Sequence, residues 1–188
     1  MEQRHAERDP IVDFGEFVKR EQTASAQTRS EDWIKERDDF LAYLSELYAQ
    51  IRSFLDEYVR SGGIKIDCRD FPLNEENIGS YTAPQMIIRI GGKEITLTPA
   101  GTLLIGAKGR VDIAGPAGRS RLVLVDRDAS GPAIKVTVRR GQAEAPAANA
   151  LPRNIKWSWK IATSPPGIQY IELTKEEFSR MLLEVVNG

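Results

Sequence analysis

The sequence predicts an α+β fold: a long amphipathic helix, an antiparallel meander of short strands and a C-terminal helix. Three observations predict it. Apolar residues recur at helical spacing from Trp33 to Tyr58, short apolar segments are punctuated by glycine and proline from Met86 to Arg140, and a capped apolar stretch ends the chain. The predicted sheet is an open meander or a partial barrel of about eight strands.

The length of 188 residues predicts one domain, residues 30–188, preceded by a weakly ordered segment, residues 1–29. Residues 22–30 are small and polar, which is typical of a linker. A short apolar cluster that could dock as one or two helical turns precedes them: Ile11, Val12, Phe14, Phe17 and Val18.

The first helix is predicted over residues 30–61. Ser30, or Thr28 with Glu31, supplies the N-terminal cap, and the apolar residues then recur at alternating steps of four and three. Gly62 and Gly63 end the helix. At 1.5 Å per residue it measures about 45 Å, which is long for a domain of this size. The apolar stripe of this helix must be buried against another segment. The sequence leaves two alternatives: the N-terminal cluster of the same chain, or a second copy in a coiled-coil-like homodimer.

The sheet is predicted over residues 64–173, because the short spacing of its apolar segments leaves no room for crossover helices. Residues 71–84 and 141–154 are predicted loops. Cys68 alternates with polar neighbours, so we expect it to point inward as a small buried side chain. Leu122–Val125 is apolar throughout, which predicts a central strand covered on both faces. The predicted strands are 64–68, 86–90, 94–98, 102–105, 110–114, 121–125, 134–139, 156–161 and 168–173.

The last helix is predicted over residues 174–186. Thr174 and Glu177 form a capping box. The apolar face of this helix consists of Phe178, Met181, Leu182 and Val185.

Composition narrows the class of protein. The single cysteine excludes an internal disulfide, no apolar run is long enough to span a bilayer, and the polar N-terminus shows no secretory signal. These features predict a cytoplasmic protein. The net charge of −1 conceals a split: residues 1–60 hold nine basic and fourteen acidic residues, and residues 61–162 hold fifteen and nine. An acidic helical part therefore precedes a basic sheet.

No catalytic residue, metal site or cofactor is predicted. The only histidine, His5, lies in the N-terminal tail, far along the chain from Cys68. Asp126 and Asp128 lie on one side of an extended chain, but they directly precede a turn, where aspartate commonly bonds backbone amides. We therefore interpret this pair as turn residues, with a metal-binding or catalytic carboxylate pair as the alternative. The glycine-rich stretches match no phosphate-binding motif and are interpreted as hairpin turns.

A basic cluster is the strongest functional signal. Its candidate anion- or partner-binding residues are Lys108, Arg110, Arg119, Arg121, Arg139 and Arg140. Trp157 and Trp159 could stack nucleic-acid bases beside these cations, but they share a strand face with Ile161, which favours the core. A pI of about 6.0 also argues against a dedicated nucleic-acid binder.

These observations predict a non-catalytic cytoplasmic binding module whose partner is an unknown protein or an anionic ligand, with a homodimer formed through the long helix. The first alternative is a nucleic-acid or anionic-ligand binder that uses the basic face of the sheet. The second alternative is a carboxylate-based enzyme.

Overall fold

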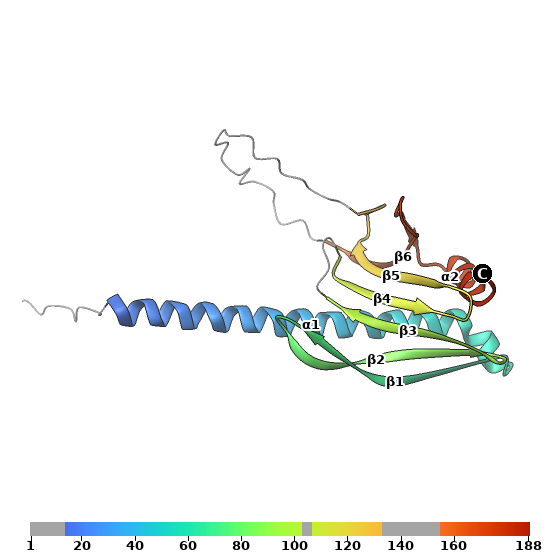
Figure 1. Ribbon diagram of the computed structural model, residues 1–188, viewed down its shortest axis with the longest axis horizontal. Coiled ribbons are helices and arrows are strands. Elements are labelled where there is room, and N and C mark those ends of the chain that lie inside the picture. The colour runs from blue at the N-terminus through green and yellow to red at the C-terminus, as the bar shows by residue number, and fades with distance from the viewer. Residues whose placement is uncertain (1–13, 103–106, 133–154) are drawn as a thin grey trace, which may run out of the picture.

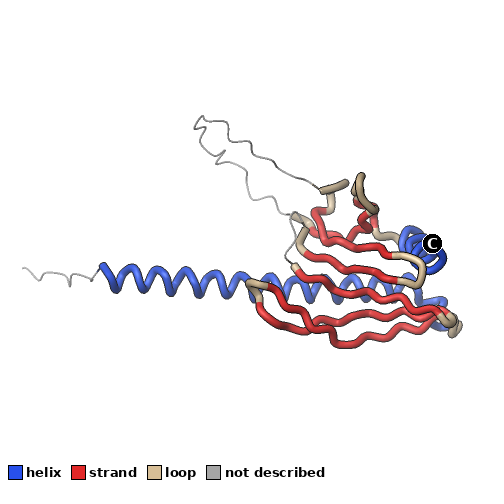
Figure 2. The backbone as a smooth tube through the Cα atoms, viewed as in Figure 1, coloured by secondary structure: helices blue, strands red, loops and turns tan. Residues whose placement is uncertain are grey.

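One open antiparallel sheet and two helices make up the fold (Figure 1). The computed structural model describes residues 14–102, 107–132 and 155–188. Helix α1 (Phe14–Arg60) crosses one face of the sheet, and α2 (Lys175–Asn187) packs at one end of it (Figure 2). The strands are β1 (Ile64–Glu75), β2 (Gly79–Ile90), β3 (Lys93–Gly101), β4 (Gly109–Ala114), β5 (Arg119–Asp126), β6 (Trp157–Ala162) and β7 (Tyr170–Glu172).

The predicted α+β meander is confirmed. The seven described strands follow one another across the sheet in chain order, and each pairs antiparallel with the next. The sheet does not close into a barrel. The predicted strand over residues 134–139, the predicted loop over residues 141–154 and most of the predicted strand over residues 102–105 lie outside the described residues.

The first helix is longer than predicted. It has 47 residues and begins at Phe14 instead of residue 30, so residues 22–30 are helical and do not form a linker. No glycine or proline occurs between residues 16 and 60, and the small polar stretch contains alanine and glutamine, which favour helix. The predicted cap at Ser30 therefore has no helix start to cap. At 1.5 Å per residue, α1 measures about 70 Å.

The second half of α1 packs against the sheet of its own chain. Its apolar stripe includes Phe40, Leu44, Leu47 and Ile51, all completely buried. The cover for this stripe is therefore the inner face of the sheet. Neither the N-terminal cluster nor a second copy is needed there. The first half of α1 extends past the sheet (Figure 1).

The core lies between α1, α2 and the inner face of the sheet. Tyr48 anchors α1 there: its hydroxyl lies 2.9 Å from the Pro84 carbonyl oxygen and 3.2 Å from that of Leu97. Gly109 lets β4 approach the helix, because a Cβ at this position would lie 2.6 Å from the ring of Phe40. This close approach requires a residue without a side chain.

The predicted loop over residues 71–84 is wrong. These residues extend β1 and β2 into a long hairpin, in which Phe71 pairs with Ala83 and Leu73 with Tyr81. Pro72 and Pro84 suggested a loop, but each lies where its strand has no neighbouring strand on one side. β1 is an edge strand, and β2 pairs with β3 only from Met86 onward.

The predicted burial of Cys68 is also wrong. Cys68 is exposed, and its Sγ lies 3.2 Å from Nη2 of Arg52 on α1. The side chain is thus on the helix side of the sheet, as the alternation predicts, but β1 is the edge strand and nothing covers it there. By contrast, the prediction for Leu122–Val125 is confirmed, since all four residues are buried in the interior strand β5.

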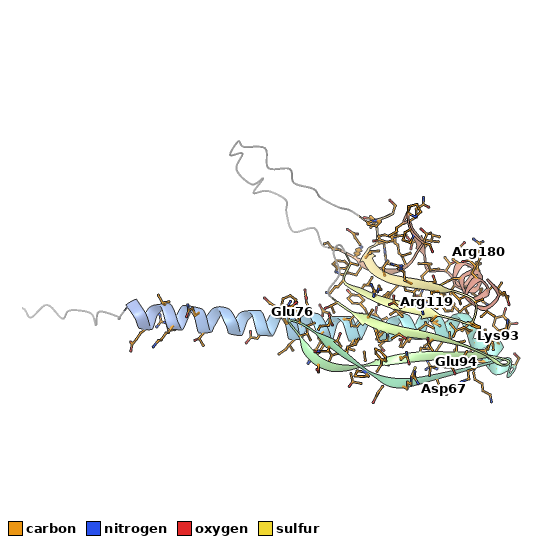
Figure 3. The ribbon with its side chains drawn as sticks, viewed as in Figure 1. Asp67, Glu76, Lys93, Glu94, Arg119 and Arg180 are labelled. Carbon is orange, nitrogen blue, oxygen red and sulfur yellow. The ribbon has the colours of Figure 1, made fainter. Side chains whose placement is uncertain are left out.

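Helix α2 is capped at both ends. The Thr174 hydroxyl accepts the Glu177 amide at 3.2 Å, which confirms this part of the predicted capping box. At the other end, the amides of Ala117 and Gly118 donate to the Val185 carbonyl at 3.0 and 3.1 Å. Lys93, labelled near this end in Figure 3, donates to Asn187 Oδ1 at 3.0 Å. The turns of the sheet thereby fix α2 in place.

Over the described ranges, no helix combines the length and the apolar character that crossing a membrane requires.

Candidate anion-binding site

The outer face of the sheet, which points away from α1, carries a row of polar side chains. Strand register places Arg69, Gln85, Thr98, Asp112 and Arg121 side by side on β1 to β5. Direct bonds link the first three: Arg69 Nε donates to Gln85 Oε1 at 2.6 Å, and Gln85 Nε2 donates to Thr98 Oγ1 at 2.5 Å. Because side chains alternate between the two faces along each strand, the residues directly before and after these on each strand point to the helix side of the sheet.

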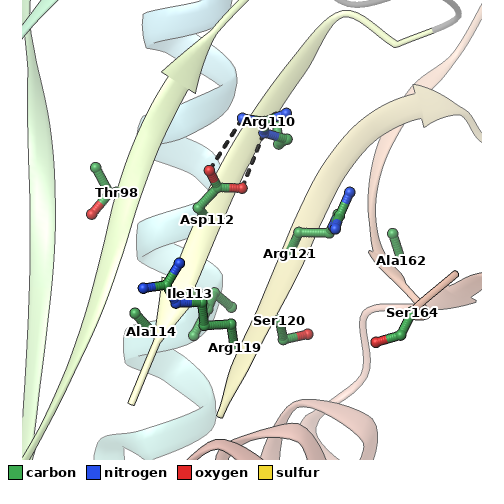
Figure 4. A pocket seen from close by; sticks show the side chains of 10 residues that line it. All are labelled: Thr98, Arg110, Asp112, Ile113, Ala114, Arg119, Ser120, Arg121, Ala162 and Ser164. Carbon is green, nitrogen blue, oxygen red and sulfur yellow. Dashed lines mark hydrogen bonds and ion pairs between the residues drawn. The ribbon is translucent and has the colours of Figure 1, made fainter. Parts of the chain in front are cut away.

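A shallow depression of about 290 Å³ lies where this row crosses β4 and β5 (Figure 4). Most of its lining is polar, and three arginines outnumber one carboxylate. The lining residues are Thr98, Arg110, Asp112, Ile113, Ala114, Arg119, Ser120, Arg121, Ala162 and Ser164.

The three arginines differ in how they are paired. Arg110 forms a forked ion pair with Asp112, two residues along the same strand: Nε lies 3.0 Å from Oδ1, and Nη2 lies 3.2 Å from Oδ2. Within residues 14–102, 107–132 and 155–188, the side chains of Arg119 and Arg121 have no hydrogen bond or ion pair. Figure 4 shows Arg119 extending toward β4 and Arg121 toward β6. Two guanidinium groups are therefore available to an added anion.

Lys108, although predicted in the same cluster, is paired with a side chain of α1 instead. Its Nζ lies 2.7 Å from Asp39 Oδ2 on α1 and within 6 Å of two ring centroids, 5.6 Å from Tyr43 and 5.8 Å from Trp157. An ion pair combined with two cation–π contacts fixes this lysine against the helix. Lys108 thus helps to hold β4 on α1 and does not line the depression.

The structure brings together three of the six predicted residues: Arg110, Arg119 and Arg121. Arg139 and Arg140 lie outside the described residues. Sequence reasoning missed Ser120 and Ser164, which add hydroxyl groups to the lining. No local signal marks Ser164, because the pairing of β5 with β6, 31 residues further along the chain, brings it close.

The tryptophans do not provide a stacking surface beside these arginines. Trp159 is buried in the core, and its Nε1 donates to the Tyr43 carbonyl at 2.9 Å. Trp157 is half-buried and packs against the same core. Their predicted core position is therefore confirmed, and both lie on the helix side of the sheet.

The aspartate pair acts in a turn. Asp126 Oδ1 accepts the Asp128 amide at 3.2 Å, and the Asp126 carbonyl accepts the Ala129 amide at 2.9 Å. This is the turn role that the sequence favoured. Among the described residues, no group of three or more histidine, cysteine or acidic side chains is arranged to hold a metal ion.

A second depression, also of about 290 Å³, adjoins the first. The two share Arg119, Ser120, Ala162 and Ser164, and the second extends to Arg180 on α2. Arg180 is ion-paired with Glu177 at 3.0 Å. The polar surface around Arg119 therefore continues from the sheet to Arg180 on the last helix (both residues are labelled in Figure 3).

No protein-family model, curated protein or solved structure matched this chain, so its function must be inferred from its own geometry.

Proposed function

We propose that this chain is a non-catalytic binding module that recognises a compact anionic group, such as a phosphate or a carboxylate, on the outer face of β4 and β5. The observation behind the proposal is the pairing contrast on this face. Arg69, Arg89 and Arg110 have polar or acidic partners, whereas Arg119 and Arg121 have none among the described residues.

The chemistry of the depression suits such a group. A guanidinium presents two parallel N–H donors that match the oxygens of a carboxylate or a phosphate. The hydroxyls of Thr98, Ser120 and Ser164 add neutral donors around the same depression. Asp112 neutralises Arg110, so the positive charge is concentrated on Arg119 and Arg121. A small anion with more than one charge is therefore favoured over a neutral ligand.

Nucleic acid is the weaker alternative. Non-specific binding of a single strand combines a continuous cationic groove with aromatic side chains on which bases stack. Here the two tryptophans pack on the opposite side of the sheet, and Lys108 is paired with Asp39. A carboxylate enzyme is weaker still, because Asp126 holds the turn that contains Asp128.

The test is titration with inorganic phosphate and pyrophosphate, followed by calorimetry at low and at moderate salt. Wild-type protein should bind pyrophosphate more tightly than phosphate, and added salt should weaken both. The double variant Arg119→Gln/Arg121→Gln should lose at least ten-fold in affinity.

The matched control is Lys65→Gln, an exposed cation on β1, away from the depression. Its affinity should equal that of the wild type. Two results would contradict the proposal: no binding of either anion at low salt, or undiminished binding by the double variant. Binding of a single-stranded oligonucleotide that is tighter than pyrophosphate binding and survives the double substitution would favour the nucleic-acid alternative.

A second candidate function is self-association through α1, and one observation favours it. The part of α1 before Phe40, 26 residues or about 39 Å at 1.5 Å per residue, has no completely buried side chain among those described, and its N-terminal end extends past the sheet. A helix that is polar on nearly all sides typically bridges between folded units. Light scattering after size-exclusion chromatography tests this candidate, and a monomer at high micromolar concentration would exclude it.

A further inference from the structure

Strand β1 forms one edge of the open sheet and has a neighbouring strand only on the β2 side (Figure 1). With 12 residues each, β1 and β2 are the longest of the described strands. The open side of such an edge presents unpaired backbone N–H and C=O groups, to which another strand can add. Among the described residues, no hydrogen bond covers these groups from Ile66 to Asp70.

The pairing of β1 with β2 shows which residues direct their backbone groups to the open side. Pro84 lies opposite Asp70, has no N–H, and turns its carbonyl away from β1 to accept the Tyr48 hydroxyl at 2.9 Å. Bonded and unbonded residue pairs alternate along an antiparallel ladder, so Asp70 and Pro84 form an unbonded pair. The N–H and C=O groups of Ile66, Cys68 and Asp70 therefore point to the open side.

Charged side chains line this open stretch on both sides of the strand. On the outer side, Asp67 is followed by Arg69, whose Nε bonds a neutral amide at 2.6 Å. On the helix side, the Arg52 guanidinium lies 3.2 Å from the Cys68 thiol, and Asp70 is exposed. Among the described residues, Arg52, Arg69 and Asp70 have no ion pair, so their charges are available to a partner.

A second copy of β1 supplies the opposite charges when the two strands pair antiparallel about a two-fold axis at Cys68. In this register, residues 64–72 of the two copies overlap, and Asp67 of each copy lies opposite Arg69 of the other. Side chains directly opposite in an unbonded pair approach most closely, which suits an ion pair. Asp67 already pairs with Arg89, but its side chain is 59% exposed and can accept a second guanidinium.

The helix side gains a further ion pair in the same register. Asp70 of the second copy lies opposite Ile66, which is two residues from Cys68 and on the same side of the strand. The Arg52 guanidinium, which contacts Cys68, is therefore one side-chain position away from this carboxylate. Two-fold symmetry repeats each contact, as in any dimer in which both copies use the same surface.

Charge also excludes the neighbouring registers. An axis at Asp67 places this residue opposite itself and Lys65 opposite Arg69, whereas an axis at Arg69 places two arginines together. Like charges directly opposite each other are destabilising. An axis at Ile66 places Lys65 opposite Asp67 but overlaps only residues 64–68. Charges on an edge strand usually prevent indiscriminate pairing, and among these registers only the axis at Cys68 combines opposite charges with a long overlap.

We propose that β1 is a dimerisation edge: two copies of the chain pair antiparallel through β1 about a two-fold axis at Cys68, so that one continuous sheet runs through both. The partner that this edge fits is thus a second copy of the same strand. The surface is separate from α1 and from the depression on β4 and β5, so the inference depends on neither candidate function above.

Charge reversal tests the register. Asp67→Arg sets like charges against Arg69 of the other copy, and Arg69→Asp does the same against Asp67, so each should raise the dimer dissociation constant about ten-fold or more. The double variant Asp67→Arg/Arg69→Asp exchanges the two charges and should restore dimerisation to near the wild-type level. Sedimentation equilibrium measures the constant, and circular dichroism checks that each variant is folded.

The matched control is Glu94→Arg on β3. Glu94 pairs with Arg89 as Asp67 does, but it lies away from the edge, so the constant should not change. A wild-type chain that stays monomeric at high micromolar concentration would overturn the inference. So would a double variant that dimerises no better than the single ones.

Cross-linking at Cys68, the single cysteine of the chain, gives an independent readout. A short bismaleimide should join two wild-type copies through the exposed thiols, and Asp67→Arg should give little product at the same protein concentration. A dimer that neither cross-links at Cys68 nor responds to charge reversal would favour self-association through α1 and overturn the pairing through β1. The two tests therefore separate this inference from the second candidate function.

Discussion

The two faces of the sheet come from the same strands but do different work. On β5, Leu122 is completely buried against the helices, while its neighbour Arg121 lines the outer depression and has no ion pair among the described residues. On β5 the inner residues belong to the main core, whereas the outer side carries part of a polar row and, further along, a smaller apolar cluster that includes Val123 and Val125. The contrast teaches that the main core lies on one face, and that the polar part of the other face is available for recognition.

The largest expected effect compares these two neighbours directly. Leu122→Ala should lower the free energy of unfolding by about 2–5 kcal/mol, because it leaves a cavity in a close-packed core. Arg121→Ala should change it by no more than about 0.5 kcal/mol. Urea denaturation monitored by fluorescence measures both. Similar losses for the two variants would show that the outer face also supports the fold.

Lys160 is an exception that sharpens the comparison. It belongs to the outer side chains of β6 but is only 4% exposed, and its Nζ contacts Glu172 Oε1 at 2.6 Å and the carbonyls of Arg127 at 2.5 Å and Ala129 at 3.0 Å. Lys160→Met should cost about 1–3 kcal/mol, because it leaves buried carbonyls without a donor.

The control for Lys160→Met is the exposed Lys156, four residues earlier, whose substitution by methionine should be nearly neutral. The urea denaturation midpoints of the Lys160→Met and Lys156→Met variants measure this difference in stability. Equal stability of both variants would contradict a structural role for the Lys160 ammonium group.

Alkaline pH should weaken the fold through two tyrosines. Burial raises the pKa of Tyr48, and burial together with the Glu75 carboxylate, 2.5 Å from its hydroxyl, raises the pKa of Tyr81. Both stay protonated in the folded chain above pH about 10, where the unfolded chain ionises. The unfolded state then binds fewer protons, so stability is full below about pH 10 and falls above it, by at most about 1.4 kcal/mol per pH unit for each tyrosine.

Urea denaturation at a series of pH values from 8 to 11 tests this expectation. The variant Tyr48→Phe/Tyr81→Phe should lose less stability above pH 10 than the wild type, whereas Tyr58→Phe should behave as the wild type does. An alkaline decline of the same steepness in all three proteins would assign the effect to other groups.

The smallest expected effect on stability is at Asp112. Asp112→Asn breaks an ion pair at the surface and should change the unfolding free energy by no more than about 0.5 kcal/mol. It also releases Arg110, so pyrophosphate should bind several-fold more tightly at low salt. The control is Glu94→Gln on β3, which also removes a carboxylate but lies outside the depression. Unchanged or weaker binding by Asp112→Asn would mean that Arg110 does not take part in anion binding.

Much of the fold is readable from the sequence because the signals are local. The uninterrupted apolar run Leu122–Val125 predicts the buried strand, and short glycine-rich spacing predicts the antiparallel order. The Thr174 cap and the apolar face of α2 follow from residues within one or two helical turns. The grouping of Arg110, Arg119 and Arg121 is also predictable, because a short hairpin places them on adjacent strands.

The errors share a different origin. Residues 22–30 are helical because nothing breaks a helix that starts at Phe14, although their composition also suits a linker. Cys68 has the alternation of a buried residue, but whether a strand lies at the edge depends on the whole sheet. Pro72 and Pro84 suggest a loop because proline cannot donate a backbone hydrogen bond. Strand pairing shows that no neighbouring strand lies on one side at these two positions.

The sequence by itself determined the fold class, the order of the elements and the inner faces of most of them, since spacing within a few residues controls periodicity, turns and caps. Only the tertiary structure decided that Lys108 pairs with Asp39 while Arg119 and Arg121 stay unpaired, and that Ser164 joins their depression. The reason is physical: the partner of a charged side chain depends on which distant segments pack beside it, and residue spacing along the chain carries no information on that distance.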